Sequence, residues 1–281
     1  MAAPLYALLH ANAQLSWTSF TVHWSTVIGI LALAGLYEWS ARIAVADRSL
    51  GAPPTPAQRA RFVAGLAAIF LSLNGPLHDL SDSFLFSAHM VQHLVLTLVV
   101  PPLLLSGTPA SLFRQALRSR AVARVARVVT KPIFCFAIFN VVLTAWHFPV
   151  AYNLAVANHP VHIVQHLMFM IAATLMWWPL LSPLPELPRL SYPLQLLYCF
   201  LMTIPMSLVA VSITYSQGML YPAYASAPRL WGISPMQDQL LGGLIMWIPG
   251  GLFFVAVMAV IFFKWAAANS DSVEGAQLAP R

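Results

Sequence analysis

Charged residues are scarce in this sequence. Only 8% of its 281 residues are Asp, Glu, Lys or Arg, whereas a soluble domain contains about 25%. So few charges exclude a chain built of soluble globular domains, and a hydrophobic content of 59% excludes disorder. The alternation of polar and apolar residues that a membrane β-barrel needs is also absent. We therefore predict an all-α, polytopic integral membrane protein.

Further absences exclude specific chemistries. The two cysteines, Cys135 and Cys199, form no Cys-x-x-Cys pair, which excludes a disulfide scaffold and a thiol motif for copper or disulfide exchange. No His-Glu-x-x-His motif of zinc peptidases occurs. No Lys or Arg precedes the small residues at 11–13, so the basic start of a signal peptide is missing. Residues 1–17 are therefore expected to be a short outer tail.

Long apolar runs are what the sequence does contain. A membrane-spanning helix needs about 20 mostly apolar residues. We predict one seven-transmembrane-helix bundle over residues 18–265, followed by a cytoplasmic tail over 266–281. The expected spans are residues 18–40, 60–75, 84–106, 131–147, 160–181, 193–215 and 239–264.

Basic residues predict the orientation of this bundle. In the seven-span scheme, Arg229 alone of the 14 Lys and Arg residues falls on the opposite side from the rest. The positive-inside rule then places the N-terminus outside and the C-terminus in the cytoplasm. A net charge of +6 could also indicate nucleic acid, but basic residues beside anionic lipid explain it, so we predict no nucleic-acid partner. The basic segment 114–131 is expected to form an interfacial amphipathic helix.

The histidines all fall in the outer loops or the outer halves of the predicted spans. Ionisable groups inside a membrane are costly and usually face a bundle interior or a cavity. A layer of histidines on one side therefore indicates a site rather than chance. The nine residues are His10, His23, His78, His89, His93, His147, His159, His162 and His166.

The spacing of the histidines also indicates a site. His89 and His93 lie four residues apart and share one helix face, as do His162 and His166. Both pairs occur in one string, HMVQHL and HIVQHL, with a proline 13 residues upstream of each. Both helices run from outside to inside in the scheme and are therefore parallel. We infer a weak internal duplication whose two histidine faces meet.

Four imidazoles near one point favour a metal site, because neutral imidazole is the commonest metal ligand. Thioethers such as Met246 lie in the same outer layer, and imidazole with thioether suits copper, particularly Cu(I). The other interpretation is that the histidines bond to Gln92, Gln165 and backbone carbonyls as packing groups. Asp79 and Asp82 in the second loop, or Asp238, could orient an imidazole or be solvated carboxylates or helix caps. The supporting candidates are His78, Asp79, His147, His159, Asp238 and Met246.

Several strings resemble those of the CtaG family of cytochrome c oxidase assembly factors. They are HMVQHL running on to PPLL and GTP (89–109), WHFP with Tyr152-Asn153 (146–153), the second histidine pair with WWP (162–179), and DQ, GG and MWIP (238–249). The resemblance covers residues 20–265. It implies a multi-pass factor of the bacterial plasma (inner) membrane, not an enzyme, that is needed to make active haem–copper oxidase and serves its copper centre.

Carried onto this sequence, the resemblance makes His89, His93, His162 and His166 the copper-handling positions. We expect transient Cu(I) binding, with copper accepted from an outer-side donor and delivered to oxidase subunits within the lipid membrane. Three other classes stay open. A membrane zinc-dependent hydrolase would show zinc and amidase activity, a haem-binding carrier would show a Soret band, and a structural partner would bind no Cu(I).

Overall fold

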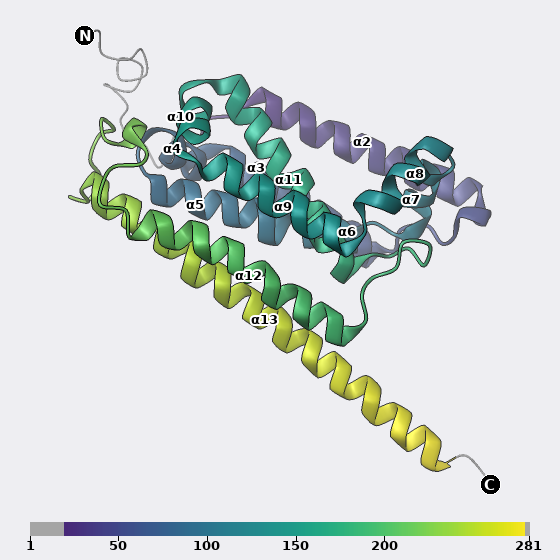
Figure 1. The fold of residues 1–281 in the computed structure, drawn as a ribbon. Helices are drawn as coiled ribbons and strands as arrows, with labels where there is room; N and C mark the ends of the chain where they lie inside the picture. Colours follow the sequence, from purple (N-terminus) through teal and green to yellow (C-terminus); the bar gives the residue numbers. More distant parts are fainter. Residues whose placement is uncertain (1–19, 279–281) are drawn as a thin grey trace.

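The computed structural model describes residues 20–278, with side chains described as far as residue 270. The predicted outer tail (1–17) and His10 lie outside the described residues. Every regular element within the described range is a helix, which confirms the all-α prediction. Most helices lie roughly along one direction and pack into an elongated bundle, from which the C-terminal part of the last helix projects (Figure 1).

The described first half of the chain contains two long helices, α2 and α3, followed by a series of shorter ones. Its elements are α2 (Trp24–Ala46), η1 (Arg48–Leu50), α3 (Pro56–Leu73), α4 (Gly75–Ser83), α5 (Phe86–Leu94), η2 (Val95–Val99), α6 (Val100–Gly107), α7 (Ala110–Leu117) and α8 (Arg120–Val129). The second half contains α9 (Pro132–His147), α10 (Pro149–Ala157), α11 (His159–Leu181), α12 (Tyr192–Thr214), η3 (Pro222–Tyr224) and α13 (Pro235–Leu278).

Within residues 20–278, five helical segments are long and apolar enough to cross a membrane, and two bent helix pairs raise the number of candidate spans to as many as seven. The chain is thus an all-helical, multi-pass membrane protein. The predicted span 160–181 agrees with α11 to within one residue, whereas the predicted span 18–40 is displaced toward the N-terminus from α2. Helix α13 continues as far as Leu278, so the described part of the predicted tail 266–281 is helical.

Helices α3 and α4 form one of the bent pairs, with an angle of 43° between them. Gly75 lies at the bend with φ of +66°, a left-handed conformation that glycine adopts without strain. A Cβ atom there would also approach the ring of Phe20 to 2.4 Å. The segment after the bend, expected as a loop, is therefore a helix. This helix places His78 and Asp82 one turn apart on the same face.

The predicted third span is one rod of three pieces: α5, a π-helical turn and α6. Pro101 has no N–H for the carbonyl of Thr97, four residues earlier. The indole of Trp177 on α11 donates to that carbonyl instead, with Nε1 2.9 Å from the oxygen. The π turn (Val95–Val99) begins two residues after His93, and such turns are frequent near functional sites.

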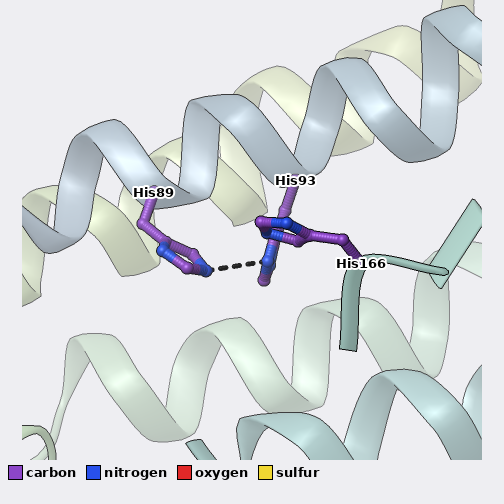
Figure 2. A group of neighbouring side chains, drawn as sticks. All are labelled: His89, His93 and His166. Atoms are coloured by element: carbon purple, nitrogen blue, oxygen red, sulfur yellow. Dashed lines mark hydrogen bonds between the residues drawn. The ribbon is translucent and has the colours of Figure 1, made fainter. Parts of the chain in front are cut away.

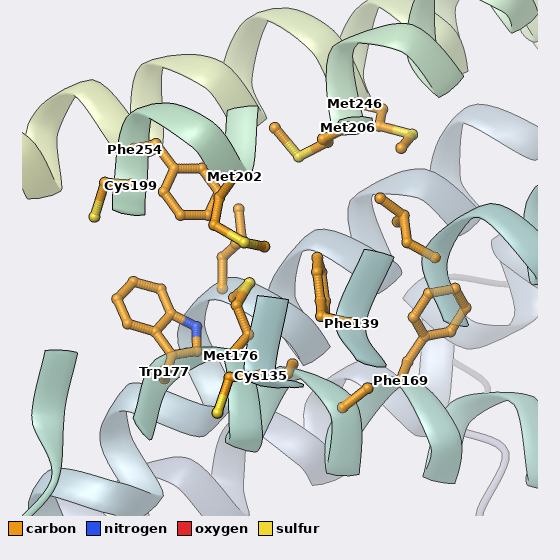
Figure 3. Close-up of a cluster of buried hydrophobic side chains, with 14 of the residues drawn as sticks. Cys135, Phe139, Phe169, Met176, Trp177, Cys199, Met202, Met206, Met246 and Phe254 are labelled. Carbon is orange, nitrogen blue, oxygen red and sulfur yellow. The ribbon is translucent and has the colours of Figure 1, made fainter. Parts of the chain in front are cut away.

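The largest hydrophobic core lies between α9, α11, α12 and α13. Figure 3 shows its aromatic and sulfur-containing side chains, among them Trp177 and Met202. Cys135 and Cys199 are fully buried in the same core and behave as small apolar groups. Helix α13 packs along α12 and also against α5. This rigid core supports the helices that carry the histidines.

The two ends of the bundle are formed by different helices (Figure 1). We name the end with α4, α10 and the start of α5 the histidine end, and the end with α7 and α8 the arginine end. The basic segment expected to form one interfacial helix is two short helices, α7 and α8. No residue of α8 is buried, and its arginines recur every three to four residues, which puts them on one face.

Candidate metal centre

Helices α5 and α11 bring their two histidine pairs together in register. The ring centroids of His89 and His162 lie 5.3 Å apart, and those of His93 and His166 lie 5.4 Å apart. Pairing first with first and second with second means that the two helices are parallel. All four rings are buried, with 0–5% of each residue exposed. The predicted convergence of the two repeated strings is therefore observed.

Three of these histidines form a group that could hold a metal ion. His89, His93 and His166 each offer a ring nitrogen, and the three nitrogens lie within 4.8 Å of one another (Figure 2). The Nε2 atoms of His89 and His93 are 2.8 Å apart. Two nitrogens that bind one tetrahedral ion at about 2.0 Å lie about 3.3 Å apart. Small side-chain rotations would therefore let the three nitrogens bind one ion. We name His89, His93 and His166 the central group.

The hydrogen bonds of Tyr224 define which nitrogen of His89 is a ligand. The Tyr224 hydroxyl donates to the carbonyl of Ser81 at 2.7 Å, so its oxygen accepts from its other neighbours. Nδ1 of His89 lies 3.3 Å from that oxygen and is thus the donor. In the neutral ring the lone pair is then on Nε2, which is the atom that faces His93. Such a partner for the second ring nitrogen is typical of metal-binding histidines.

A hydrogen bond also defines which nitrogen of His147 carries the lone pair. Its Nδ1 donates to the carbonyl of Leu143 at 2.7 Å, which leaves the lone pair on Nε2. That Nε2 is buried and has no hydrogen-bond partner among the described residues. His147 lines a small cavity of about 20 Å³ together with His93 and the thioethers of Met206 and Met246. The structure thus places the supporting candidates His147 and Met246 directly behind the central group.

A second group contains a carboxylate. Ligand atoms of Asp82, His89 and His162 lie within 4.8 Å of one another. We name these residues the carboxylate group. Its acidic member on α4 is Asp82, whereas Asp79 accepts a hydrogen bond from the hydroxyl of Thr21 at 3.0 Å. The His78–Asp82 spacing of four residues was a signal in the sequence, but it had meaning only once this segment was known to be helical.

The other supporting candidates have different positions. His159 begins α11, is exposed and belongs to neither group. Asp238 is fully buried at the start of α13 and accepts from the backbone N–H groups of Phe86 and Ser87, at 2.7 Å and 3.0 Å. It therefore caps α5, one turn before His89. Sequence reasoning considered a cap for Asp238, but nothing in the sequence identifies which helix it caps.

Hydrogen bonding alone does not account for this histidine layer. Nδ1 of His93, Nε2 of His162 and Nε2 of His166 are buried without a hydrogen-bond partner within the described part of the chain. Buried polar atoms are paired in the great majority of cases, because leaving one unpaired costs about 1–3 kcal/mol. A bound ion would use such lone pairs. The residues present therefore fit a metal ion.

A family model for cytochrome c oxidase caa3 assembly factors matches residues 33–268. The chain belongs to this family. The matched range contains the central group, the carboxylate group and the Asp238 cap. The family resemblance noted in the sequence is confirmed.

Relatives of this family member include three uncharacterized mycobacterial proteins. Those of Mycobacterium bovis and Mycobacterium tuberculosis are each 26% identical over 200 residues, which cover 66% of this chain and 30% of theirs. That of Mycobacterium leprae is 23% identical over 217 residues, or 72% of this chain and 33% of that protein. The chain thus spans about a third of the length of these relatives. No solved structure matches the chain.

Proposed function

We propose that this assembly factor binds one Cu(I) ion at the central group and delivers it to the copper centre of cytochrome c oxidase. The observation that carries the proposal is the group itself: His89, His93 and His166 gather three buried ring nitrogens within 4.8 Å. Family membership supplies the oxidase as the target.

The ligand types favour copper among the metals. Neutral imidazoles dominate the central group, and the thioethers of Met206 and Met246 line the cavity behind His93. Soft and borderline ligands of this kind suit Cu(I), whereas Mg²⁺ and Ca²⁺ require oxygen ligands. The tautomer of His89 leaves its Nε2 lone pair available to copper. Nε2 of His93, 2.8 Å away, donates its proton to that lone pair, so binding of copper between the two rings shifts this proton to Nδ1 of His93.

Delivery requires that copper leave the protein again. A few neutral imidazoles hold an ion less firmly than thiolates would, and ligands can be exchanged one at a time as histidines of the oxidase approach. With the arginine end in the cytoplasm, the histidine end faces the outer side of the plasma membrane. An outer-side donor can then load the protein, and the oxidase subunit can approach laterally through the lipid.

A double substitution tests the proposal. In the purified full chain, His93→Ala with His166→Ala removes two of three ligands. Its affinity for Cu(I), measured by competition with a chromophoric chelator, should fall by more than the roughly 10–100-fold caused by losing an outer-shell partner. In cells the variant should reach normal membrane levels while the oxidase keeps its haem and lacks copper.

His159→Ala is the matched control. It removes the same side chain from the same helix but lies outside both groups and is exposed, so affinity and oxidase copper should stay normal. The conservative double variant with His93→Gln and His166→Gln distinguishes the loss of metal ligands from a packing defect, because glutamine fills more of the space that alanine leaves empty. Oxidase with full copper content in either double variant would contradict the proposal.

One observation favours a rival from another class, a membrane zinc hydrolase. The carboxylate group offers two imidazoles and a carboxylate, a ligand set found in catalytic zinc sites. Metal analysis separates the two functions, since zinc in the purified protein together with lipid amidase activity would support the hydrolase. The haem-binding alternative fits less well. It needs one histidine of α5 and one of α11 as axial ligands on opposite faces of a porphyrin, and the centroids of the rings that meet across the two helices lie only 5.3 to 5.8 Å apart.

A further inference from the structure

The carboxylate group lies next to the central group and has no role in the function proposed above. Asp82 comes from α4, His89 from α5 and His162 from α11. Oδ1 of Asp82 is 3.4 Å from Nδ1 of His162. Three separate elements thus direct potential ligands at one position, and His89 belongs to both groups.

A chain of hydrogen bonds holds His78 beside the carboxylate of Asp82. The side-chain amide of Gln92 donates to the carbonyl of Ser72 at 2.6 Å, which defines its Nε2 as the NH₂ group. The same NH₂ group lies 3.0 Å from Nδ1 of His78, so Nδ1 accepts and Nε2 of His78 carries the proton. That Nε2 lies 3.4 Å from Oδ2 of Asp82 and makes no hydrogen bond to a described residue. A small rotation would let it donate to Asp82, in the manner of partners that hold metal-binding carboxylates.

A cavity leads to both groups from the side of the bundle. Its volume is about 290 Å³, and it lies between α2 and α11. His78, His162 and His166 line it on one side, while exposed residues of α2, including Ile28 and Gly29, line it on the other. An ion that enters this cavity reaches His162 of the carboxylate group and His166 of the central group.

We propose that Asp82, His162 and His89 form a receiving position, which takes copper from the cavity and passes it to the central group. This inference rests on the proposed function. The negative charge of Asp82 attracts a cation and offsets the cost of bringing it into an apolar bundle. A carboxylate is a poorer ligand for Cu(I) than a third imidazole, so the ion is held more weakly here than in the central group.

The transfer is a ligand exchange. The ion releases Asp82 and His162, keeps His89, and gains His93 and His166. Its oxidation state does not change. As His93 joins the ion, the proton that its Nε2 donates to Nε2 of His89 moves to its own Nδ1, which has no other partner among the described residues, so no proton leaves the site. Because His89 serves both positions, they are occupied alternately, and the protein holds one copper ion at a time.

The first test is the rate of loading. In the purified full chain, Asp82→Asn and, separately, His162→Gln should slow the transfer of Cu(I) from a chromophoric chelator by about tenfold or more, the scale on which a local charge changes association rates. The equilibrium affinity of the central group should stay close to that of the unmodified protein. Asp79→Asn is the matched control, three residues away on the same helix and bonded to Thr21, and it should load normally.

The second test isolates the receiving position. A protein with His93→Ala and His166→Ala should still bind one Cu(I) ion, at lower affinity, and should lose it when Asp82→Asn is added. Asp79→Asn in the same background should leave the ion bound. Asp82→Glu, which keeps the charge, should restore most of the loading rate if Asp82→Asn slows it.

The outcomes separate the two proposals. If Asp82→Asn and His162→Gln load at the normal rate, and the His93→Ala, His166→Ala protein binds no copper, the receiving position is refuted while the central site stands. If the unmodified protein binds no Cu(I) and its absence leaves the oxidase copper-replete, the proposed function itself is refuted. Residual binding that depends on Asp82 supports the receiving position.

Discussion

The histidine end and the arginine end differ in whether their polar side chains are buried. At the histidine end, seven imidazoles form a continuous series of ring contacts from His23 to His147, and most of them are buried. At the arginine end the polar groups stay near the surface. Burial without full pairing is costly, so the first arrangement requires a function and the second does not.

Ion pairs at the arginine end connect segments that are distant in sequence. Arg118 pairs with Asp47, and Arg114 contacts Glu186 at 2.7 Å while also donating to the carbonyl of Leu50. Bonds from Ser49 and then Arg118 lower the pKa of Asp47, and the bond from Arg114 lowers the pKa of Glu186. These contacts tie loops to helices, but exposed pairs contribute little stability.

The largest effect should come from Asp238 at the histidine end. Asp238→Ala removes the acceptor of two backbone bonds and of the 2.6 Å bond from the Ser87 hydroxyl, all buried. We expect a loss of about 3 kcal/mol in the free energy of unfolding, because charged hydrogen bonds are strong and the N–H groups become unpaired. Unfolding in mixed micelles measures it. Asp79→Ala, whose bond to Thr21 is exposed, should cost far less, and equal losses would refute the contrast.

Tyr224→Phe should have a smaller and more specific effect. It removes the hydroxyl that holds His89 in its Nδ1–H form and that donates to Ser81. Affinity for Cu(I) should fall by about 10–100-fold, as it does when other outer-shell partners of metal ligands are lost. The binding competition assay measures the change. Tyr215→Phe, at an exposed tyrosine of the same connection, is the control, and equal affinities in both variants would contradict this role.

The smallest effect should come from Arg114→Gln at the arginine end. We expect this variant to lose up to about 1 kcal/mol in the free energy of unfolding. Because the bridge lowers the pKa of Glu186, its stabilisation is fully present above the unfolded value of about 4.3 and is lost as the pH falls through the lower folded value. The unfolding midpoint of the variant should therefore lose this acid dependence. The control Arg124→Gln, on exposed α8, should retain the acid dependence of the unfolding midpoint. If the midpoint of Arg114→Gln changed with pH as it does in the unmodified protein, the Arg114–Glu186 bridge would not contribute to stability.

The helical spans and the histidine faces were predictable because both depend on short-range rules. Apolar runs of about 20 residues identify spanning helices. A spacing of four places His89 with His93, and His162 with His166, on one helix face whatever the rest of the fold does. The displaced boundary of α2 shows the limit of that rule, since the helix begins only at Trp24 and continues past the charged Arg42 to Ala46.

The roles of Asp82, Tyr224 and Asp238 could not be predicted from such short-range rules. Asp82 rather than Asp79 joins the histidines because the chain bends at Gly75 and continues as α4, where the expectation was a loop. Tyr224 lies in the connection between α12 and α13, 135 residues after its partner His89. Asp238 caps a helix 151 residues away. No local pattern reports contacts over such separations.

By itself, the sequence determined that this protein is a helical membrane bundle with basic residues concentrated away from its histidines, because hydropathy, charge and helical period act within a few turns of chain. Only the tertiary structure decided that three imidazoles meet within reach of one ion, that Asp82 stands beside them, and which nitrogen of His89 carries a lone pair. Those properties depend on helix packing and on hydrogen bonds between distant segments, where differences of an ångström decide whether a ligand set exists.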